Sequence, residues 1–334
     1  MVDVDTFLTT VYVLVDEVCQ QEWPNERVGA EARSGPAPAL SRSEVITLAL
    51  FAQWTPFTSE RAFYRYAERH LGAAFPALPA RSQFNRQLCR QRECLVAVGL
   101  VVARCLEQAV RAQRRAGEPC PYEIVDGMGV ATRNLKRRGG GWLAQVATLG
   151  RCTRLGWYKG VHLLTAVTPQ GVHLLTVVTP QGVLSGYGIA PAHTKDQPLA
   201  ETFFAARHTP QPRLPEVGHP VADGLYLADS GYEGRRWHTH WEQDYAATVI
   251  VRPKATDPHP WSPAFRRSFA GLRQIVETVH ARLLDTFGLG LLRPHSPVGL
   301  RAHLAAKLVA YNVALWLNLQ WHRPLLAFAD LLDW

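Results

Sequence analysis

Two short apolar runs that each end in an aspartate constrain this chain more than any other feature. Residues 124–125 lead directly into Asp126, and residues 225–228 lead into Asp229. A glycine follows each aspartate, either directly or after one residue. Apolar runs of this length that end in turn residues are typical of buried strands. The pattern therefore predicts two buried strands that each carry one carboxylate at the C-terminal end, where the two acids can lie side by side.

A third acid, Glu277, lies in a segment with helical periodicity. The apolar positions of this segment recur every three or four residues: Leu272, Ile275, Val276, Val279 and Leu283. We therefore predict an amphipathic helix with Glu277 beside its packed stripe. Three carboxylates in a chain of formal net charge +8 favour a site that holds Mg²⁺ or Mn²⁺ over a phosphodiester, because these ions prefer oxygen ligands.

The chain resembles the DDE transposases of bacterial insertion sequences. The resemblance rests on Val125-Asp126-Gly127, on Ala228-Asp229-Ser230-Gly231-Tyr232, and on Arg273 followed four residues later by Glu277. It covers most of the chain from about residue 121 to about residue 318. It implies an α/β ribonuclease-H-like catalytic domain, a mixed sheet flanked by helices, behind an all-helical N-terminal domain.

The same resemblance implies a chemistry and its partners. Asp126, Asp229 and Glu277 would hold two Mg²⁺ (or Mn²⁺) ions. The enzyme would cut double-stranded DNA at the terminal inverted repeats of its transposon and transfer the strand into target DNA, acting as a homodimer. The sequence departs from the family at Ala270 and Leu284, where many relatives have tyrosine and a basic residue, and Phe269 or Arg282 could stand in by a small offset.

Each of these acidic motifs is also compatible with a different role. Asp-Gly is a common turn sequence, and Glu277 stands one helical turn after Arg273, where it could form an ordinary surface ion pair. Paired carboxylates also serve as acid and base in metal-free hydrolases such as glycosidases, although a sugar substrate would not explain the basic charge. A copy that binds DNA without cutting it is the other alternative.

Helical periodicity and capping signals fill the first part of the chain. We predict helices over residues 4–22, from Ser41 to about Trp54, from Thr58 or Ser59 through His70, and a single long helix from Ser82 to about Arg115. A polar segment with Gly and Pro follows. We therefore expect a helical DNA-binding region over residues 1–115 and the catalytic domain with its C-terminal helix over residues 116–334.

Several basic residues are candidates for contact with DNA. After the first aspartate comes a basic, glycine-rich tract that contains Arg133, Lys136, Arg137 and Arg138. Arg273 and Arg282 are candidates beside Glu277, and Arg81, Arg86, Arg90 and Arg92 are candidates in the N-terminal region. The alternatives are a surface loop for the tract and a solvated helix face for the N-terminal arginines.

A tandem repeat interrupts the expected sheet. Residues 161–171 and 172–182 differ at one position only, and each copy reads as a strand that ends in a Pro-Gln-Gly turn. An additional strand would invert the direction in which the chain leaves a ribonuclease-H-like meander. Either one copy loops out or adds an edge strand, which leaves the catalytic strands intact, or the sheet is disturbed and the copy is inactive.

Thr194 or Asp196 is expected to cap a helix that ends near Ala206, so Asp196 is left out of the metal ligands.

The remaining features indicate where in the cell the protein is located. An apolar helix over residues 300–319 reads as a core helix and not as a membrane span. The first residues lack the positive charge of a signal peptide. We expect a bacterial cytoplasmic protein that is nucleoid-associated when it is bound to DNA.

Overall fold

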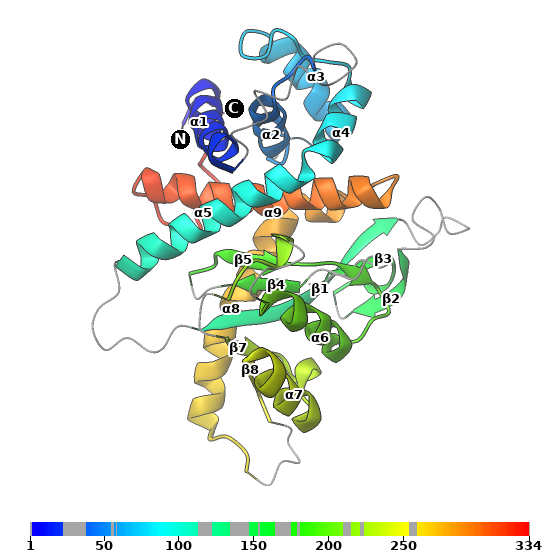
Figure 1. Cartoon of the computed structure of the whole chain (residues 1–334), viewed down its shortest axis with the longest axis vertical. Coiled ribbons are helices and arrows are strands. Elements are labelled where there is room, and N and C mark those ends of the chain that lie inside the picture. Colours follow the sequence, from blue (N-terminus) through cyan, green and yellow to red (C-terminus); the bar gives the residue numbers. More distant parts are fainter. Residues whose placement is uncertain are drawn as a thin grey trace.

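The computed structural model describes residues 2–22, 38–54, 57, 59–112, 122–133, 147–152, 154–163, 175–178, 181–209, 215–220, 224–253 and 259–333. A helical N-terminal region lies over an α/β domain (Figure 1). Two long helices, α5 (Arg92–Ala112) and α9 (Pro297–Gln320), pack along each other between the N-terminal helices and the sheet. None of the helices in the described part of the chain is long and apolar enough to cross a membrane.

The N-terminal helices form where the capping signals predict them, with one correction. They are α1 (Val4–Glu22), α2 (Arg42–Phe51), α3 (Glu60–His70), α4 (Arg81–Arg90) and α5. Ser41 and Glu44 form the predicted capping box of α2, and the Ser59 hydroxyl caps α3. The single long helix expected from Ser82 is wrong, because the chain breaks at Gln91. The Gln91 side chain accepts a hydrogen bond from Arg42 at this break, which ties it to the start of α2.

The helical region shares its hydrophobic core with the C-terminal part of the chain. Phe7 of α1 packs edge-on against Trp54, whose ring lies 5.3 Å from that of Phe287. Helix α9 is buried along nearly all of its length, as expected for a core helix. Its buried Asn312 is satisfied by the backbone of Leu184, at the start of a sheet strand. The two regions are therefore held together by continuous packing.

The sheet is built around one long strand, β1 (Glu123–Arg133). On one side β1 pairs in parallel with β7 (Leu225–Ala228), and β7 pairs in parallel with β8 (Thr248–Val251). On the other side β1 pairs antiparallel with β3 (Gly156–Leu163) and β4 (Leu175–Val178). Beyond these lie β2 (Thr148–Cys152), β5 (Leu184–Tyr187) and β6 (Ala190–Pro191). The first strand was expected to end at Asp126, but it continues for seven more residues because β3 pairs with its second half.

The tandem repeat leaves the register of the sheet intact. Leu163, at the end of β3, is paired with Met128, and Leu175, at the start of β4, is paired with Gly127. β3 and β4 run in the same direction and pair with consecutive residues of β1, as one continuous strand would. The ladder thus skips a length of eleven residues, which equals one repeat; residues 164–174 lie outside the described residues. The inversion of chain direction expected for an additional strand does not occur, and β1 remains paired with both β4 and β7.

Helices cover both faces of the sheet. Helices α6 (Asp196–Arg207) and α7 (Arg235–Tyr245) pack on one face in a cluster that includes Phe204, Tyr226 and Trp241. Helix α8 (Pro263–Asp285) lies across the other face, where it contacts β1 and β4 (Figure 1). Three short 3₁₀ turns complete the described elements: η3 (Pro215–Val217), η4 (Ser230–Tyr232) and η5 (Leu289–Leu291).

Candidate active site

Strand alternation directs the two predicted aspartates toward helix α8. Ile124 and Leu227 pack in the core on the α8 side, whereas Val125 and Ala228 pack in the cluster on the α6 and α7 side. Because side chains alternate along a strand, the residues after Val125 and Ala228 return to the α8 side. Val125 and Ala228 are paired in register, so Asp126 and Asp229 are the next positions on adjacent strands.

Arg273 of α8 lies between these two acids. Its Nη2 atom is 3.8 Å from Oδ1 of Asp126, and its Nη1 atom is 3.5 Å from Oδ1 of Asp229. The backbone N–H of Gly127 donates a further hydrogen bond of 2.9 Å to Asp126. The Arg273 side chain is mostly buried, with 19% exposed. Both contacts are longer than a tight ion pair, so the guanidinium bridges the acids loosely.

The structure does not bring the third predicted acid into this group. Glu277 lies one turn beyond Arg273 on α8, and its side chain is exposed. In the described part of the chain, no three Asp, Glu, His or Cys side chains are grouped closely enough to hold one metal ion. Of the proposed substitutes for the family residues, Phe269 is buried against Trp261, and Arg282 is exposed.

The negative charge of the buried acids is only partly compensated by Arg273. Burial raises the pKa of Asp126 from its usual value near 4 to about 7, with smaller contributions from Asp229 and Asp196, and Arg273 only partly opposes this rise. Burial and the neighbouring Asp229 also raise the pKa of Asp196. The guanidinium of Arg273 therefore compensates Asp126 and Asp229 only in part, and Asp196 adds further negative charge beside Asp229.

Asp196 is the acid whose role the sequence pattern predicted wrongly. It is the first residue of α6, but the N-cap is Lys195, and no side chain caps this helix. Instead its carboxylate lies against Gly231, where an added Cβ would meet the Asp196 carboxylate and lie 3.2 Å from its Cγ. The Asp-Ser-Gly turn thus leaves space for a carboxylate from another element. An aspartate without a capping bond cannot be recognised from a helix-start pattern alone.

The residues present fit a divalent cation. Mg²⁺ is commonly bound by one or two carboxylates together with waters and substrate phosphates, and Asp126 and Asp229 offer such a donor set. The buried hydroxyl of Tyr232 has no hydrogen-bond partner among the described residues, and burial next to the same acids raises its pKa. An orphan buried hydroxyl is costly, so the chain does not fully satisfy the polar groups of this region by itself.

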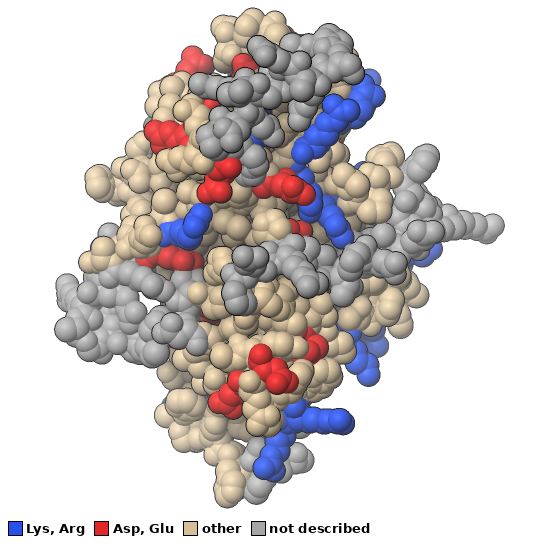
Figure 2. Space-filling view, in the orientation of Figure 1, with Lys and Arg blue, Asp and Glu red and all other residues tan. Residues whose placement is uncertain are grey.

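The residues expected to contact DNA are only partly described. Lys136, Arg137, Arg138 and the Arg133 side chain lie outside the described residues. Arg81, Arg86 and Arg90 are exposed on α4, whereas Arg92 pairs with Glu216 at 3.1 Å and so joins α5 to η3. On the face in Figure 2, most basic side chains follow the right-hand side, from the level of α4 to that of α7.

Comparison with known families identifies this region. The family model described as transposase DDE domain matches residues 125–313, which is more than half of the chain. The match begins one residue before Asp126 and includes Asp229, Arg273 and Glu277. No curated protein and no solved structure matched the chain in the corresponding searches. Such proteins generally use divalent metals and act on DNA, and the family match shows that this chain belongs to the DDE transposases.

Proposed function

We propose that this chain is an insertion-sequence transposase that cuts DNA at the ends of its element and joins the freed 3′-hydroxyl to target DNA. We further propose that its catalytic domain has the ribonuclease-H-like fold. The strand order supports this second proposal. If β3 and β4 are taken as one strand and β5 and β6 as another, these two strands and β1 form an antiparallel meander. The short strand β2 precedes β3 in the chain and pairs with its outer edge, and β7 and β8 follow parallel to β1.

Asp126, Asp229 and Glu277 are the proposed catalytic carboxylates. The observation that supports this assignment is the convergence of Asp126 and Asp229 on Arg273 inside the family match. Glu277 lies one turn after Arg273 on α8, so the proposal requires its exposed side chain to turn toward the two aspartates when metal and DNA bind. When bound, a pair of divalent cations would supply Lewis acidity and activate a water for in-line attack on the phosphodiester.

The residues of the chain itself have three tasks in this reaction. Asp126 must lose its proton before it can act as an oxygen ligand, which its raised pKa makes sensitive to pH near neutrality. Arg273 holds the two aspartates at one edge of the sheet before DNA arrives. Its guanidinium can then turn to a phosphate group, two oxygens of which arginine binds in a bidentate manner.

Substitution of the strand acids tests the function. Asp126→Asn and Asp229→Asn should each lower Mg²⁺-dependent cleavage of DNA that carries the inverted repeats flanking the gene by about 10³-fold or more, because neutral amides are poor ligands for hard cations. Binding of the same DNA, measured by fluorescence anisotropy, should change less than about twofold. Asp244→Asn on α7, with its exposed side chain, is the matched control and should cut normally. Cleavage by Asp126→Asn or Asp229→Asn at the normal rate, or full cleavage in EDTA, would contradict the proposal.

The alternative of an inactive DNA-binding copy rests on the tandem repeat. The continuous ladder opposite β1 argues against it, because the pairing around Asp126 is that of an uninterrupted strand. Deletion of residues 164–174 should join Leu163 to Leu175 in register and leave cleavage within about twofold of the unmodified chain, as expected for loop shortening. If cleavage appears only after this deletion, the present copy is inactive.

A further inference from the structure

Two thiols meet in the helical region, at the contact between α1 and α5. Cys19 lies near the end of α1, and Cys94 lies in the first turn of α5, 75 residues further along the chain. Figure 1 shows α1 lying against α5. The two sulfur atoms are 3.1 Å apart, and both side chains are buried. The proposed DNA cleavage makes no use of this pair of nucleophilic side chains.

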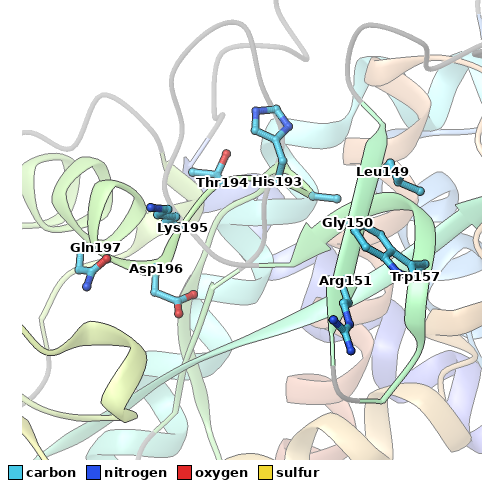
Figure 3. A pocket seen from close by; sticks show the side chains of 10 residues that line it. Leu149, Gly150, Arg151, Trp157, His193, Thr194, Lys195, Asp196 and Gln197 are labelled. Atoms are coloured by element: carbon cyan, nitrogen blue, oxygen red, sulfur yellow. The ribbon is translucent and has the colours of Figure 1, made fainter.

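The other three described cysteines lie elsewhere in the molecule. Cys89 is half-buried on α4, and Cys105 is exposed on α5. Cys152 ends β2, directly after Arg151, which is labelled in Figure 3. These thiols are therefore internal controls for any chemistry assigned to the pair.

The pair is close to the geometry of a disulfide. The S–S bond of a disulfide is about 2.05 Å long. The sulfur atoms of Cys19 and Cys94 therefore have to approach each other by only about 1 Å. A bond between them would also close a long loop of the chain, which strongly restricts the unfolded state.

The surroundings of the pair distinguish the two thiols. The hydrogen bond from the Cys94 thiol lowers the pKa of Cys19, and the charge of Arg42 lowers it further. Burial and the charge of Asp16 oppose this shift. The same hydrogen bond and burial raise the pKa of Cys94. Because the thiolate is the reactive form of a cysteine, Cys19 should react first with an oxidant.

Hydrogen bonds between three helices hold the structure around the pair. Arg42, the first residue of α2, donates to Gln91, which stands directly before α5. Ser43 of α2 donates to Asp16 of α1. Arg92, the first residue of α5, pairs with η3 of the catalytic domain. A covalent bond from α1 to the start of α5 would therefore fix α1 to a part of the chain that is already joined to the sheet domain.

We propose that Cys19 and Cys94 form a reversible disulfide when the protein meets a peroxide, and that this bond fixes α1 to α5. In the first step the Cys19 sulfur attacks an oxygen of hydrogen peroxide. The S–O bond forms, the O–O bond breaks, and water leaves with the thiol proton, so Cys19 becomes a sulfenic acid.

The second step closes the disulfide. The Cys94 sulfur attacks the Cys19 sulfur, the S–S bond forms, the S–O bond breaks, and a second water leaves with the Cys94 proton. The two sulfurs together lose two electrons, which reduce the peroxide to water. A dithiol reverses the bond by thiol–disulfide exchange.

The test is oxidation of the full, folded chain with hydrogen peroxide. This oxidant is small and uncharged, as the pair requires, because only 7% of Cys19 and 3% of Cys94 is exposed. The remaining thiols are alkylated and the protein is digested with trypsin, which places Cys19 in residues 1–27 and Cys94 in residues 93–104. Mass spectrometry should find these two peptides joined, and dithiothreitol should separate them.

The bond should also change stability. The melting temperature of the oxidised chain should be higher than that of the reduced chain by about 4–10 °C, because the disulfide restricts the unfolded state. Absence of the joined peptide, or equal melting temperatures for the oxidised and reduced chains, would overturn the inference.

Serine variants test the order of the two steps. Cys94→Ser keeps a hydroxyl that can donate to Cys19, so dimedone, which labels sulfenic acids, should label Cys19 in this variant. Cys19→Ser should show much less labelling of Cys94. The reverse pattern would overturn the assignment of Cys19 as the attacking thiol. Cys105→Ser, which changes an exposed thiol on the same helix as Cys94, should form the joined peptide normally, and its loss in this control would count against the pair.

This inference does not depend on the proposed function. Asp126→Asn should form the same disulfide as the unmodified chain, because the pair lies in the helical region and Asp126 lies on β1. If the unmodified chain cuts no DNA but still forms the bond between Cys19 and Cys94, the proposed function fails and the disulfide stands.

Discussion

Strand β1 carries two acids three residues apart, and each meets an arginine in a different way. Glu123 and Arg207 are both fully buried, and Oε1 of Glu123 lies 2.7 Å from Nη2 of Arg207. Arg207 also donates to the backbone carbonyls of Val217 and His219. The Ser185 hydroxyl accepts a hydrogen bond from Arg207 and donates one to Glu123, so it bridges the pair. Asp126 and Arg273 are 3.8 Å apart, and about one fifth of each side chain is exposed.

Because of this difference, we interpret Glu123 and Arg207 as a structural ion pair, and Asp126 and Arg273 as a pair whose members can bind other groups. The Glu123 pair is surrounded by fixed donors and acceptors, so removal of one member leaves a buried charge without compensation. The Asp126 pair is loose, is shared with Asp229 and borders Asp196, so its charges are not fully satisfied within the chain. A cation can compensate such unsatisfied negative charge at the edge of a sheet.

Breaking the closed pair should have the largest effect on stability. Arg207→Met should lower the free energy of unfolding by about 3–5 kcal/mol, because Glu123 would remain buried and unpaired. Arg273→Met, the matched change in the loose pair, should cost less than about 1 kcal/mol. Urea unfolding followed by circular dichroism measures both. Equal losses for the two variants would show that the pairs do not differ in the way described.

The loose pair should contribute a component of its own to the pH dependence of stability. The folded-state pKa of Asp126, about 7, lies above its unfolded value near 4, so the native state binds this proton more tightly. The resulting stabilisation is fully present below pH 4 and is lost as pH rises to 7, a fall of roughly 2–4 kcal/mol. In EDTA, Asp126→Asn should remove this component from the stability profile between pH 4 and 8. A profile that the substitution leaves unchanged would mean that Asp126 is ionised throughout this range.

The smallest expected effect tests the position of Asp196 beside Gly231. Gly231→Ala should lower stability by about 1–2 kcal/mol, because the new Cβ would collide with the Asp196 carboxylate. Asp196→Ala removes that carboxylate. Adding Gly231→Ala to the Asp196→Ala variant should therefore cost much less stability than Gly231→Ala does in the unmodified chain. Thermal melts of the four proteins give the coupling energy. Additive losses would place Asp196 away from Gly231.

Much of the fold could be predicted from local sequence. The helix starts at Ser41 and Ser59 are local hydrogen-bonding patterns, and the two aspartates follow short apolar runs that are recognisable without tertiary information. Asp196 could not be placed in this way, because its proximity to Gly231 depends on how α6 packs beside η4. The bridging role of Arg273 likewise depends on which face of the sheet α8 covers. The convergence of Glu277 with the aspartates stays a prediction.

The junction between Leu163 and Leu175 has a practical consequence. Backbone pairing on β1 proceeds there as though the intervening segment had zero length. An epitope, a fluorophore-binding peptide or a tether could therefore replace that segment without changing which side chains face α8. The duplication therefore provides an insertion site beside β1 at which a label could be attached to the protein.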